Sequence, residues 1–281
     1  MKKAIILFLM LFLVLIMSGC DITDRSLTKK IISAIDEKDY LTIETIASNE
    51  YYNINQKPYA NSMLPRMIEQ WNLPPLHYAC LRGEFEAVKI LIDHGADINL
   101  KIDYMTPLMY CAHTIHTAEG MKILSLLIEN GANVSLKDKY DNSVLDYIFY
   151  GGYNESFEKK QFECFMEIIK IDSCLAYEEL KYKDSVGSGN FLHKVVYFNN
   201  SLVANYLIMH LGFDVDKLNN DKETSLMIAA KLNNYEVAKA LCENGANVTL
   251  KNGDGKTALD LAIQYNSGKI IELFKEIEKG V

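Results

Sequence analysis

The residues best suited to metal chemistry are His113, His116 and Glu119, which follow one another at every third position. On a helix, this spacing could place all three side chains on one sector. The surrounding pattern instead puts them in a turn between two short helices, and a structural metal site needs four ligands. We therefore interpret this segment as a solvated turn, and we expect no metal and no cofactor.

No other pattern in the sequence predicts catalysis. We find no nucleophile elbow, no phosphate-binding loop and no dinucleotide-binding glycine motif. The short run Gly187-Ser188-Gly189 lacks the strand and helix that a phosphate-binding turn requires, and we interpret it as a linker. The chain is therefore expected not to be an enzyme, to have no catalytic residue and to use no small-molecule substrate.

Composition limits the class of partner. The chain has 281 residues, 49% of them apolar, and a net charge of −8. The apolar content is enough for a sizeable core, whereas an acidic body repels the phosphate backbone of nucleic acids. We therefore expect no nucleic-acid partner.

A short sequence motif, called the phrase below, recurs along the chain. We expect each copy to form the same kinds of secondary-structure element. The central leucines of successive copies are Leu76, Leu108, Leu145, Leu192, Leu226 and Leu259. Most steps between them, and the step between the closing glycines Gly212 and Gly245, fit a repeat of about 33 residues. The step from Leu145 to Leu192 is longer, so the fourth copy contains an insertion. Such a period indicates stacked units, each too small to bury its own apolar face.

Each copy predicts two short helices joined by a turn. The second helix of the first copy has an apolar stripe at Ala87, Val88, Leu91 and Ile92. The closing glycine, Gly95, suits a left-handed helix cap. The stripe maps onto Ile123, Leu124, Leu127 and Ile128, and onto Val237, Ala238, Leu241 and Cys242.

The most specific pieces of the phrase are Thr106-Pro107-Leu108 and Pro75-Leu76-His77-Tyr78-Ala79, each followed by a Gly-Ala ending. These pieces resemble ankyrin repeats over residues 72–281. The resemblance implies an all-α solenoid of stacked helix-turn-helix units with short hairpin-like connecting turns. It also implies that His77 and His193 tie neighbouring turns by hydrogen bonds.

We expect four parts along the chain. Residues 1–19 form a signal peptide, 20–26 a tether, and 27–71 an N-terminal capping helical unit followed by a long insertion. Residues 72–281 form the array of about six units, of which the fourth, 140–188, is enlarged and degenerate and the last is a C-terminal cap.

The N-terminus has the features of an export signal. Lys2 and Lys3 precede an uncharged stretch, Ala4–Met17, that is too short to span a membrane as a helix. The following Ser18-Gly19-Cys20 resembles a bacterial lipoprotein signal, although Met17 stands where that family usually has leucine. The resemblance implies acyl chains on Cys20 that anchor an exported protein to a bacterial membrane, on its periplasmic or outer-surface side. A cleaved soluble signal and an uncleaved anchor are the alternatives.

With Cys20 lipidated, five cysteines remain, so not all of them can pair. Neighbouring helix axes lie too far apart for Cys80 and Cys111 to bond. Cys164 and Cys174 could meet only if their helix ends near Asp172. We favour free, buried thiols.

The resemblance places partner binding on the turns and on the exposed faces of the first helices, which form a concave surface in ankyrin repeats. Tyrosines there are good contact residues because they are large and stiff, although they could instead cover gaps left by degenerate stacking. The insertions at 50–70 and 151–160 are second candidates. The candidate contacts are Arg82, Asp103, Met105, His113, Lys139, Tyr140, Asn142, Tyr150, Tyr197, Phe198, Asp221, Glu223, Lys231, Asp254, Lys256 and Tyr265.

The sequence therefore predicts a membrane-anchored, non-catalytic protein-protein interaction module or scaffold of the bacterial cell envelope, whose partner it does not identify. One alternative is an accessory subunit that organises an envelope enzyme. A weaker one is an enzyme or metal-binding protein that uses the enlarged fourth unit or the pair His113 and His116.

Overall fold

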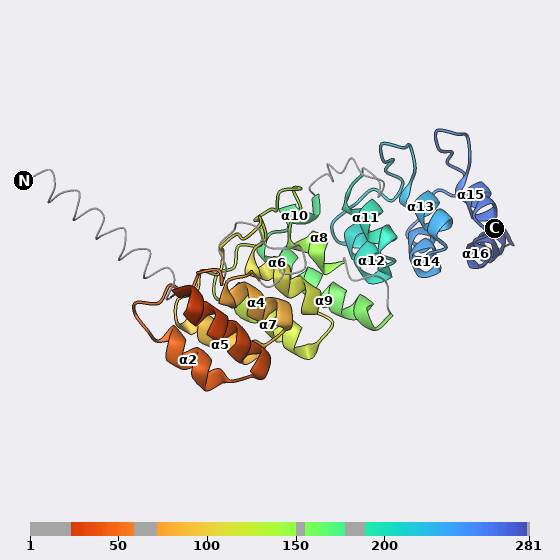
Figure 1. Cartoon of the computed structure of the whole chain (residues 1–281). Helices are drawn as coiled ribbons and strands as arrows, with labels where there is room; N and C mark the ends of the chain where they lie inside the picture. Colours follow the sequence, from red (N-terminus) through yellow and green to blue (C-terminus); the bar gives the residue numbers. More distant parts are fainter. Residues whose placement is uncertain (1–23, 59–71, 150–154, 178–188, 280–281) are drawn as a thin grey trace, which may run out of the picture. The chain divides into compact units, whose positions relative to one another are not determined.

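The computed structural model describes residues 24–58, 72–149, 155–177 and 189–279 (Figure 1). Across these residues the chain is helical, with isolated bridges such as Ile102–Met105 and no β-strand. The expected all-α solenoid is confirmed. No helix in the described parts has both the length and the apolar character needed to cross a membrane. The N-terminal segment with Cys20, residues 59–71 of the expected insertion, and Tyr150 lie outside the described residues.

Contacts divide the chain into two units, residues 1–138 and 139–281. In the first unit, residues 24–37 form a helix that precedes α2. The other helices are α2 (Tyr40–Ala47), α4 (Pro75–Arg82), α5 (Phe85–Asp93), α6 (Pro107–Cys111), the 3₁₀ turn η1 (Ala112–Thr114) and α7 (Ala118–Glu129). The first helices α4 and α6 pack on each other, and α5 packs between α2 and α7 in a second layer.

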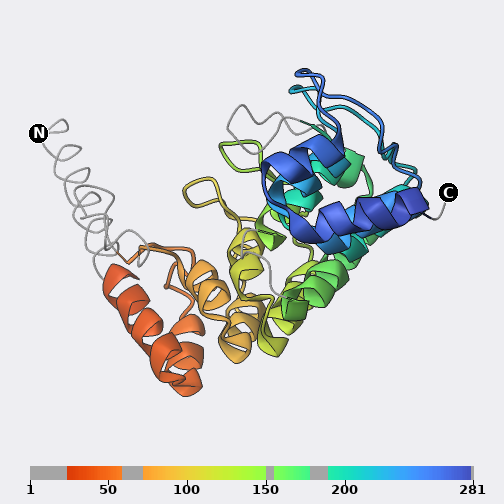
Figure 2. The same ribbon diagram turned by 90° about the vertical axis from the view of Figure 1, so that its right-hand side faces the viewer.

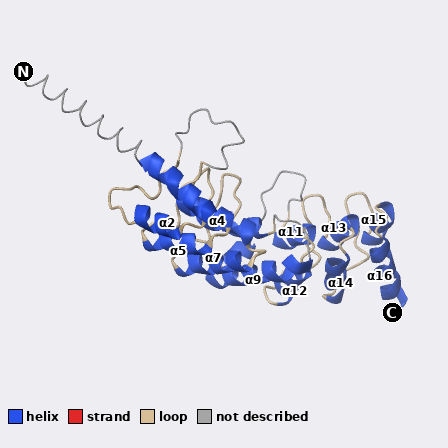
Figure 3. Ribbon diagram, turned by 60° about the horizontal axis from the view of Figure 1, so that its bottom comes forward, coloured by secondary structure: helices blue, strands red, loops and turns tan. Residues whose placement is uncertain are grey.

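The second unit has the same two layers. Its helices are α8 (Val144–Ile148), α9 (Glu155–Ile171), α10 (Cys174–Tyr177), α11 (Phe191–Tyr197), α12 (Ser201–Met209), α13 (Ser225–Leu232), α14 (Tyr235–Glu243), α15 (Ala258–Gln264) and α16 (Gly268–Lys279). The first helices α11, α13 and α15 form one row, and α9, α12, α14 and α16 form the other (Figure 3).

Local sequence sets the limits of these helices. Thr106, Thr224 and Thr257 each accept a hydrogen bond at the start of a first helix from a backbone N–H three positions later. Gly95 and Gly245, which follow second helices, have φ of +81° and +84°, a conformation that glycine adopts without a steric cost. These threonines and glycines thus begin and end the helices at the positions that the repeat pattern predicts.

The predicted apolar stripe is buried at three of its four positions. Ala87, Val88 and Leu91 are fully buried, and so are their equivalents in α7 and α14. The fourth position, Ile92 in α5, is only half-buried. Each second helix therefore buries a narrower stripe than the sequence indicated.

The enlarged fourth repeat differs from the expectation. Residues 151–160 were expected to form a loop, but α9 already begins at Glu155 and runs for 17 residues. Aromatic rings fill the space around it: Phe165 stacks on Phe191, and Phe191 and Phe198 both contact Phe149. The extra residues therefore lengthen a helix that packs on an aromatic core, which rules out residues 155–160 as a binding loop.

A buried ion pair links the fourth and fifth repeats. Asp146 in α8 pairs with Lys194 in α11, and their side chains are 9% and 7% exposed. Asp146 also accepts hydrogen bonds from the backbone N–H and the hydroxyl of Ser143, at 2.6 and 3.0 Å. One carboxylate thus caps its own helix and neutralises a buried cation from the next repeat.

Candidate protein-binding surface

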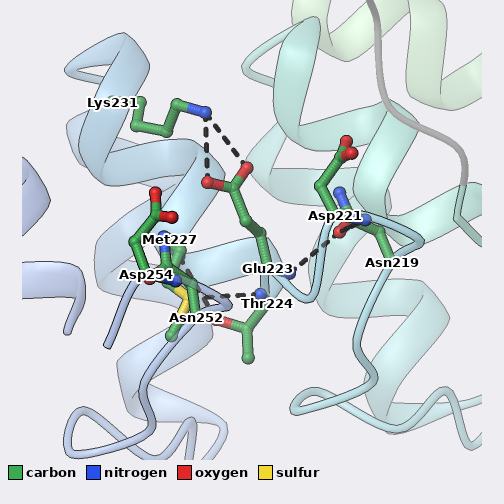
Figure 4. A network of polar contacts seen from close by, with 8 residues as sticks. All are labelled: Asn219, Asp221, Glu223, Thr224, Met227, Lys231, Asn252 and Asp254. Atoms are coloured by element: carbon green, nitrogen blue, oxygen red, sulfur yellow. Dashed lines mark hydrogen bonds and ion pairs between the residues drawn. The ribbon is translucent and has the colours of Figure 1, made fainter. Parts of the chain in front are cut away.

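Two loops of the second unit, residues 214–224 and 247–257, project beside the first helices α13 and α15 (Figures 1 and 2). In the first loop, the side-chain oxygen of Asn219 accepts hydrogen bonds from the backbone N–H groups of Asp221 and Glu223, at 2.9 and 2.8 Å (Figure 4). The backbone N–H of Asn219 donates to the carbonyl of Glu223 at 2.9 Å. The asparagine thereby closes the loop tip on itself.

The second loop repeats this arrangement at the equivalent positions of the next copy. Asn252 accepts from the backbone N–H groups of Asp254 and Lys256, both at 3.0 Å, and its own N–H donates to the Lys256 carbonyl at 2.9 Å. We call Asn219 and Asn252 the clamp asparagines. Because both tips are fixed by internal bonds, Asp221 and Asp254 project from loops whose backbone is already ordered.

A polar pair joins each loop to its first helix. Lys231 of α13 lies 3.1 Å from both carboxylate oxygens of Glu223 (Figure 4), and its Nζ is 6.0 Å from the ring centre of Tyr265. Burial lowers the pKa of Lys231, but the hydrogen bond and charge of Glu223 outweigh that effect and leave the pKa above its ordinary value. The equivalent pair one repeat later is Lys256 and Gln264, at 2.6 Å.

A buried histidine in each unit is hydrogen-bonded to a connecting loop. The Nε2 of His77 donates to the carbonyl of Leu100 at 2.9 Å, and the Nε2 of His193 donates to the carbonyl of Lys217 at 3.0 Å. Burial lowers the pKa of His77 to about 4 and also lowers the pKa of His193, so both rings are neutral at pH 7. The bonds that the ankyrin resemblance implied between these histidines and neighbouring turns are confirmed.

The two histidines differ at their other ring nitrogen. The Nδ1 of His193 accepts from the backbone N–H of Asn190 at 3.2 Å, which completes a capping box. At the equivalent position before His77 stands Pro74, which has no N–H, and the Nδ1 of His77 has no hydrogen-bond partner. The first repeat therefore starts with an incomplete cap.

In the first unit, the candidate residues are tied to the capping helices and to a loop. The Nε of Arg82 lies 3.0 Å from the carboxylate of Asp36, which also accepts a hydrogen bond from the hydroxyl of Tyr78. Asp103 lies 3.6 Å from the Nζ of Lys57. These contacts hold Arg82 and Asp103 in place while leaving their side chains exposed.

Tyr140 is the most exposed candidate at the start of the second unit. The residue is 63% exposed, and the Nζ of Lys139 lies 4.8 Å from the centre of its ring. An exposed aromatic ring next to a cation is a good contact for another protein, because it offers a flat apolar face and a polar edge.

The candidate contacts differ in accessibility. Arg82, Asp103, His113, Lys139, Tyr140, Asp221, Asp254 and Tyr265 are exposed or carry exposed side chains. Met105, Tyr197, Phe198, Lys231 and Lys256 are half-buried. Asn142 and Glu223 are only 4% and 8% exposed, so the structure does not support their selection as direct contacts. Glu223 instead acts by holding Lys231.

Sequence reasoning missed four exposed apolar residues on the same kind of surface, one of which is Leu218 in loop 214–224. Tyr104 is at a loop tip in the first unit, and Leu232 and Ile263 are on α13 and α15. Leu232 occupies the position in its repeat that Tyr265 occupies in the next, so the repeat offset alone could have identified it. We define the first-helix surface as the exposed residues of loops 214–224 and 247–257 together with those of α13 and α15 and of the residues that end these two helices.

The metal hypothesis gains no support from the described residues, among which no group of three or more His, Cys, Asp and Glu side chains could hold an ion. His113 is in the 3₁₀ turn, Glu119 is in the first turn of α7, and His116 lies between them. Among the described cysteines none forms a disulfide, the pair Cys164 and Cys174 included. Cys80, Cys111 and Cys164 are buried as expected, whereas Cys174 is exposed and Cys242 is half-buried, so the expectation of buried thiols is wrong for these two.

Paired helices stacked in register, with clamped loops at one edge, define a repeat protein that presents a preformed surface to other proteins. The family model for ankyrin repeats (three copies) matches residues 32–138 and 192–281. The chain therefore belongs to the ankyrin repeat family, whose fold is typically a non-catalytic protein-protein interaction scaffold.

The chain is similar to part of a much longer human protein. It is 22% identical over 213 residues to the human transient receptor potential cation channel subfamily A member 1, a match that covers 73% of this chain and 18% of the channel. The chain thus spans less than a fifth of that relative.

Among solved structures, the human ASB11 ankyrin repeat domain matches with a TM-score of 0.59 and 23% identity, covering 83% of this chain and 90% of that one. A chain of the complex between the Bdellovibrio bacteriovorus predatory endopeptidase Bd0816 and the immunity protein Bd3460 matches with a TM-score of 0.54 and 22% identity, covering 68% and 92%. Both likenesses concern the fold.

Proposed function

We propose that this protein is a lipid-anchored, non-catalytic binding module of a bacterial envelope, and that it holds another protein on its first-helix surface. The observation that carries the proposal is the pair of clamp asparagines, which order two loop tips before any partner arrives. Preordered loops bind with a smaller entropy cost than flexible ones.

The chemistry of the surface fits a protein partner. Asp221 and Asp254 supply two exposed carboxylates at equivalent positions, and Leu232 and Tyr265 supply exposed apolar area at the ends of α13 and α15. Alternating charged and aromatic groups are typical of protein interfaces, in which aromatic anchors supply most of the affinity.

A photo-crosslinking amino acid at Tyr265, introduced in cells that express the full chain, tests the binding surface. We expect one stoichiometric crosslinked protein, which mass spectrometry will identify. The matched control carries the same probe at Lys239, an exposed residue of α14 in the second row of helices. Equal crosslinking of that protein at both positions, or none at Tyr265, would refute the assignment of the surface.

The clamp asparagines supply a second test. In the variant Asn219→Ala the loop tip loses two hydrogen bonds, so we expect weaker capture of the same partner with little change in helical content. Asn205→Ala, at a half-buried polar residue of α12, is the control. Unchanged capture by Asn219→Ala would show that loop order does not contribute to binding.

The proposed anchor rests on Lys2-Lys3, the short uncharged stretch and Ser18-Gly19-Cys20. We expect metabolic labelling with a clickable fatty acid to mark the full chain and to fail for Cys20→Ala, which should also leave the membrane fraction. Labelling that persists in Cys20→Ala would rule out this cysteine as the lipid site. If the partner crosslinked at Tyr265 proves to be an envelope enzyme, the alternative role as an accessory subunit is the one that applies.

A further inference from the structure

The sequence places asparagine directly before glycine at three points, Asn130-Gly131, Asn244-Gly245 and Asn252-Gly253. In such a step the backbone nitrogen of the glycine can attack the side-chain carbonyl of the asparagine, because glycine has no Cβ to hinder the approach. The attack closes a succinimide ring and expels ammonia, so the asparagine is lost. Whether a step reacts in the folded chain depends on the hydrogen bonds of the attacking nitrogen and of the leaving amide.

Two of the three steps are held by hydrogen bonds at helix ends. Asn130 and Asn244 directly follow α7 and α14. The N–H of the glycine after each asparagine donates to a carbonyl of the preceding helix, in both cases at 3.0 Å. The side-chain nitrogens of Asn130 and Asn244 also donate to carbonyls of the preceding helix, at 2.8 and 2.7 Å. At these two steps, therefore, both the attacking nitrogen and the leaving amide are tied.

The third step lies in loop 247–257 and has the opposite hydrogen-bond pattern. Within the described part of the chain, neither the N–H of Gly253 nor the side-chain nitrogen of Asn252 has a hydrogen-bond partner. Gly253 is exposed, so water or hydroxide can reach its N–H and remove the proton, and Asn252 is only half-buried. The attacking nitrogen and the leaving amide are therefore both available for reaction.

The clamp that orders this loop also activates the carbonyl that is attacked. The side-chain oxygen of Asn252 accepts hydrogen bonds from the N–H groups of Asp254 and Lys256, both at 3.0 Å. These bonds curl the side chain back over the loop backbone, which contains the nitrogen of Gly253. When that nitrogen attacks, the oxygen becomes an oxyanion, and two N–H donors at this distance stabilise it as an oxyanion hole does.

We propose that Asn252 is a self-modification site, at which the folded loop promotes the loss of its own clamp asparagine. The nitrogen of Gly253 gives its proton to water and forms a bond to the Cγ of Asn252. The bond from Cγ to the amide nitrogen breaks, and that nitrogen takes up a proton and leaves as ammonia. Water then opens the succinimide at either of its carbonyls, which gives aspartate or isoaspartate. Water is the only co-reactant.

The two products change the loop differently. Aspartate keeps a side-chain oxygen that accepts from Asp254 and Lys256, so the clamp survives with an added negative charge. Isoaspartate routes the backbone through the side chain and lengthens it by the side-chain methylene, which disrupts the bond of 2.9 Å from the N–H of Asn252 to the carbonyl of Lys256. The other clamp asparagine, Asn219, precedes Asn220, whose Cβ hinders the attack, so loop 214–224 keeps its clamp.

Peptide mapping by mass spectrometry measures the reaction in the purified full chain, kept in detergent at mildly alkaline pH. We expect the mass gain of replacing an amide by an acid at Asn252 at least about tenfold faster than at Asn130 or Asn244, since one oxyanion donor contributes about 10²–10³ in an enzyme site and less in an exposed loop. In guanidinium chloride the three steps lose their folded geometry, so their rates should become similar.

Gly253→Ala is the matched variant. Its added Cβ would lie 3.6 Å from the nearest atom, a side-chain carbon of Lys222, and Gly253 does not have a left-handed backbone, so the loop accommodates the methyl group. We expect this variant to slow the reaction at Asn252 while the circular dichroism spectrum stays unchanged. Gly268→Ala, in α16, is the control and should leave the rate at Asn252 unchanged, because no atom lies within 4 Å of its added Cβ.

Three results would overturn the proposal. The first is an Asn252 that stays an amide, or that reacts no faster than Asn130 and Asn244 in the folded chain. The second is a rate at Asn252 that is lower in the folded chain than in guanidinium chloride, since the two N–H donors would then give no assistance. The third is a rate that Gly253→Ala leaves unchanged. The reaction needs no partner, so these outcomes are independent of the proposed binding function.

Discussion

Removing the buried carboxylate of Asp146 tests how the enlarged repeat is held to the next one. In Asp146→Ala, Lys194 loses its ion-pair partner at a position where its side chain is 7% exposed. An exposed ion pair contributes at most about 1 kcal/mol, whereas breaking a buried one costs about 3–5 kcal/mol. The loss of the helix cap at Ser143 adds about 1 kcal/mol. We therefore expect the free energy of unfolding to fall by about 4 kcal/mol or more.

Removing the lysine of the pair should lower the free energy of unfolding by less than removing the carboxylate does. In Lys194→Met the carboxylate of Asp146 keeps both donors from Ser143, at 2.6 and 3.0 Å. A carboxylate that remains hydrogen-bonded at a helix start is partly stabilised, so we expect a loss of about 1–3 kcal/mol. The double variant should be more stable than the sum of the two changes indicates, by about 2 kcal/mol, because each single substitution already removes the same ion pair.

Urea unfolding followed by circular dichroism at equilibrium measures all four proteins of this cycle. The result is interpretable only if the dependence of the free energy on urea stays the same across the set, because a change would indicate altered cooperativity. Additive effects within about 0.5 kcal/mol would show that the two side chains do not interact energetically. That outcome would refute the assignment of a strong buried pair.

Three further outcomes are expected. Gly120→Ala should destabilise the first unit by about 1–3 kcal/mol, because the added Cβ would lie 1.9 Å from the carbonyl oxygen of Thr114 and α7 would have to move. Thermal unfolding checks this, and an unchanged Tm would contradict the close approach. The free energy of unfolding should also fall as the pH drops from 6.5 to about 4. In this range His77 becomes protonated in the unfolded chain but stays neutral in the folded chain. The lowering of the His77 pKa from 6.5 to about 4 corresponds to about 3 kcal/mol, and His77→Gln should flatten the pH dependence of urea midpoints. Finally, Pro74→Thr supplies the N–H that the Nδ1 of His77 lacks and a hydroxyl to cap α4, so we expect a gain of about 1 kcal/mol in urea unfolding. A loss of stability would show that the ring of Pro74 contributes more than the cap.

The parts of the fold that recur along the chain were predictable from sequence, because the same residue types stand at equivalent positions of several copies. The stripe at Ala87, Val88 and Leu91 reappears with the same spacing in α7 and α14, and the glycines that close these helices have the expected left-handed backbone. Helix caps such as Thr106 follow from the same alignment.

The parts that occur once were not predictable. Asp146 and Lys194 lie in different repeats, and nothing local to either residue indicates a buried partner. Glu155 starts a helix in a polar stretch whose composition is typical of a loop, because aromatic packing further along α9 supplies the stability that local sequence lacks.

The surface was predictable only in part. Repeat alignment identifies Asp221 and Tyr265 as outward residues, but it cannot tell that Glu223, two positions beyond Asp221 in the loop, folds back onto Lys231. Burial of Asn142 in the degenerate repeat was missed for the same reason, since its neighbours depart from the pattern on which the alignment rests.

The two clamp asparagines also bear on how such a chain evolves. Because the loop near Asn219 and the one near Asn252 make the same internal bonds, copying the stretch between these asparagines would insert a new segment whose edges already match its neighbours. Duplication across Asp146 and Lys194 has no such freedom, since a copy of either repeat alone would separate the two members of this ion pair. The ion pair thus fixes the order of the segments it joins, while the C-terminal half of the same unit remains open to gene-level expansion.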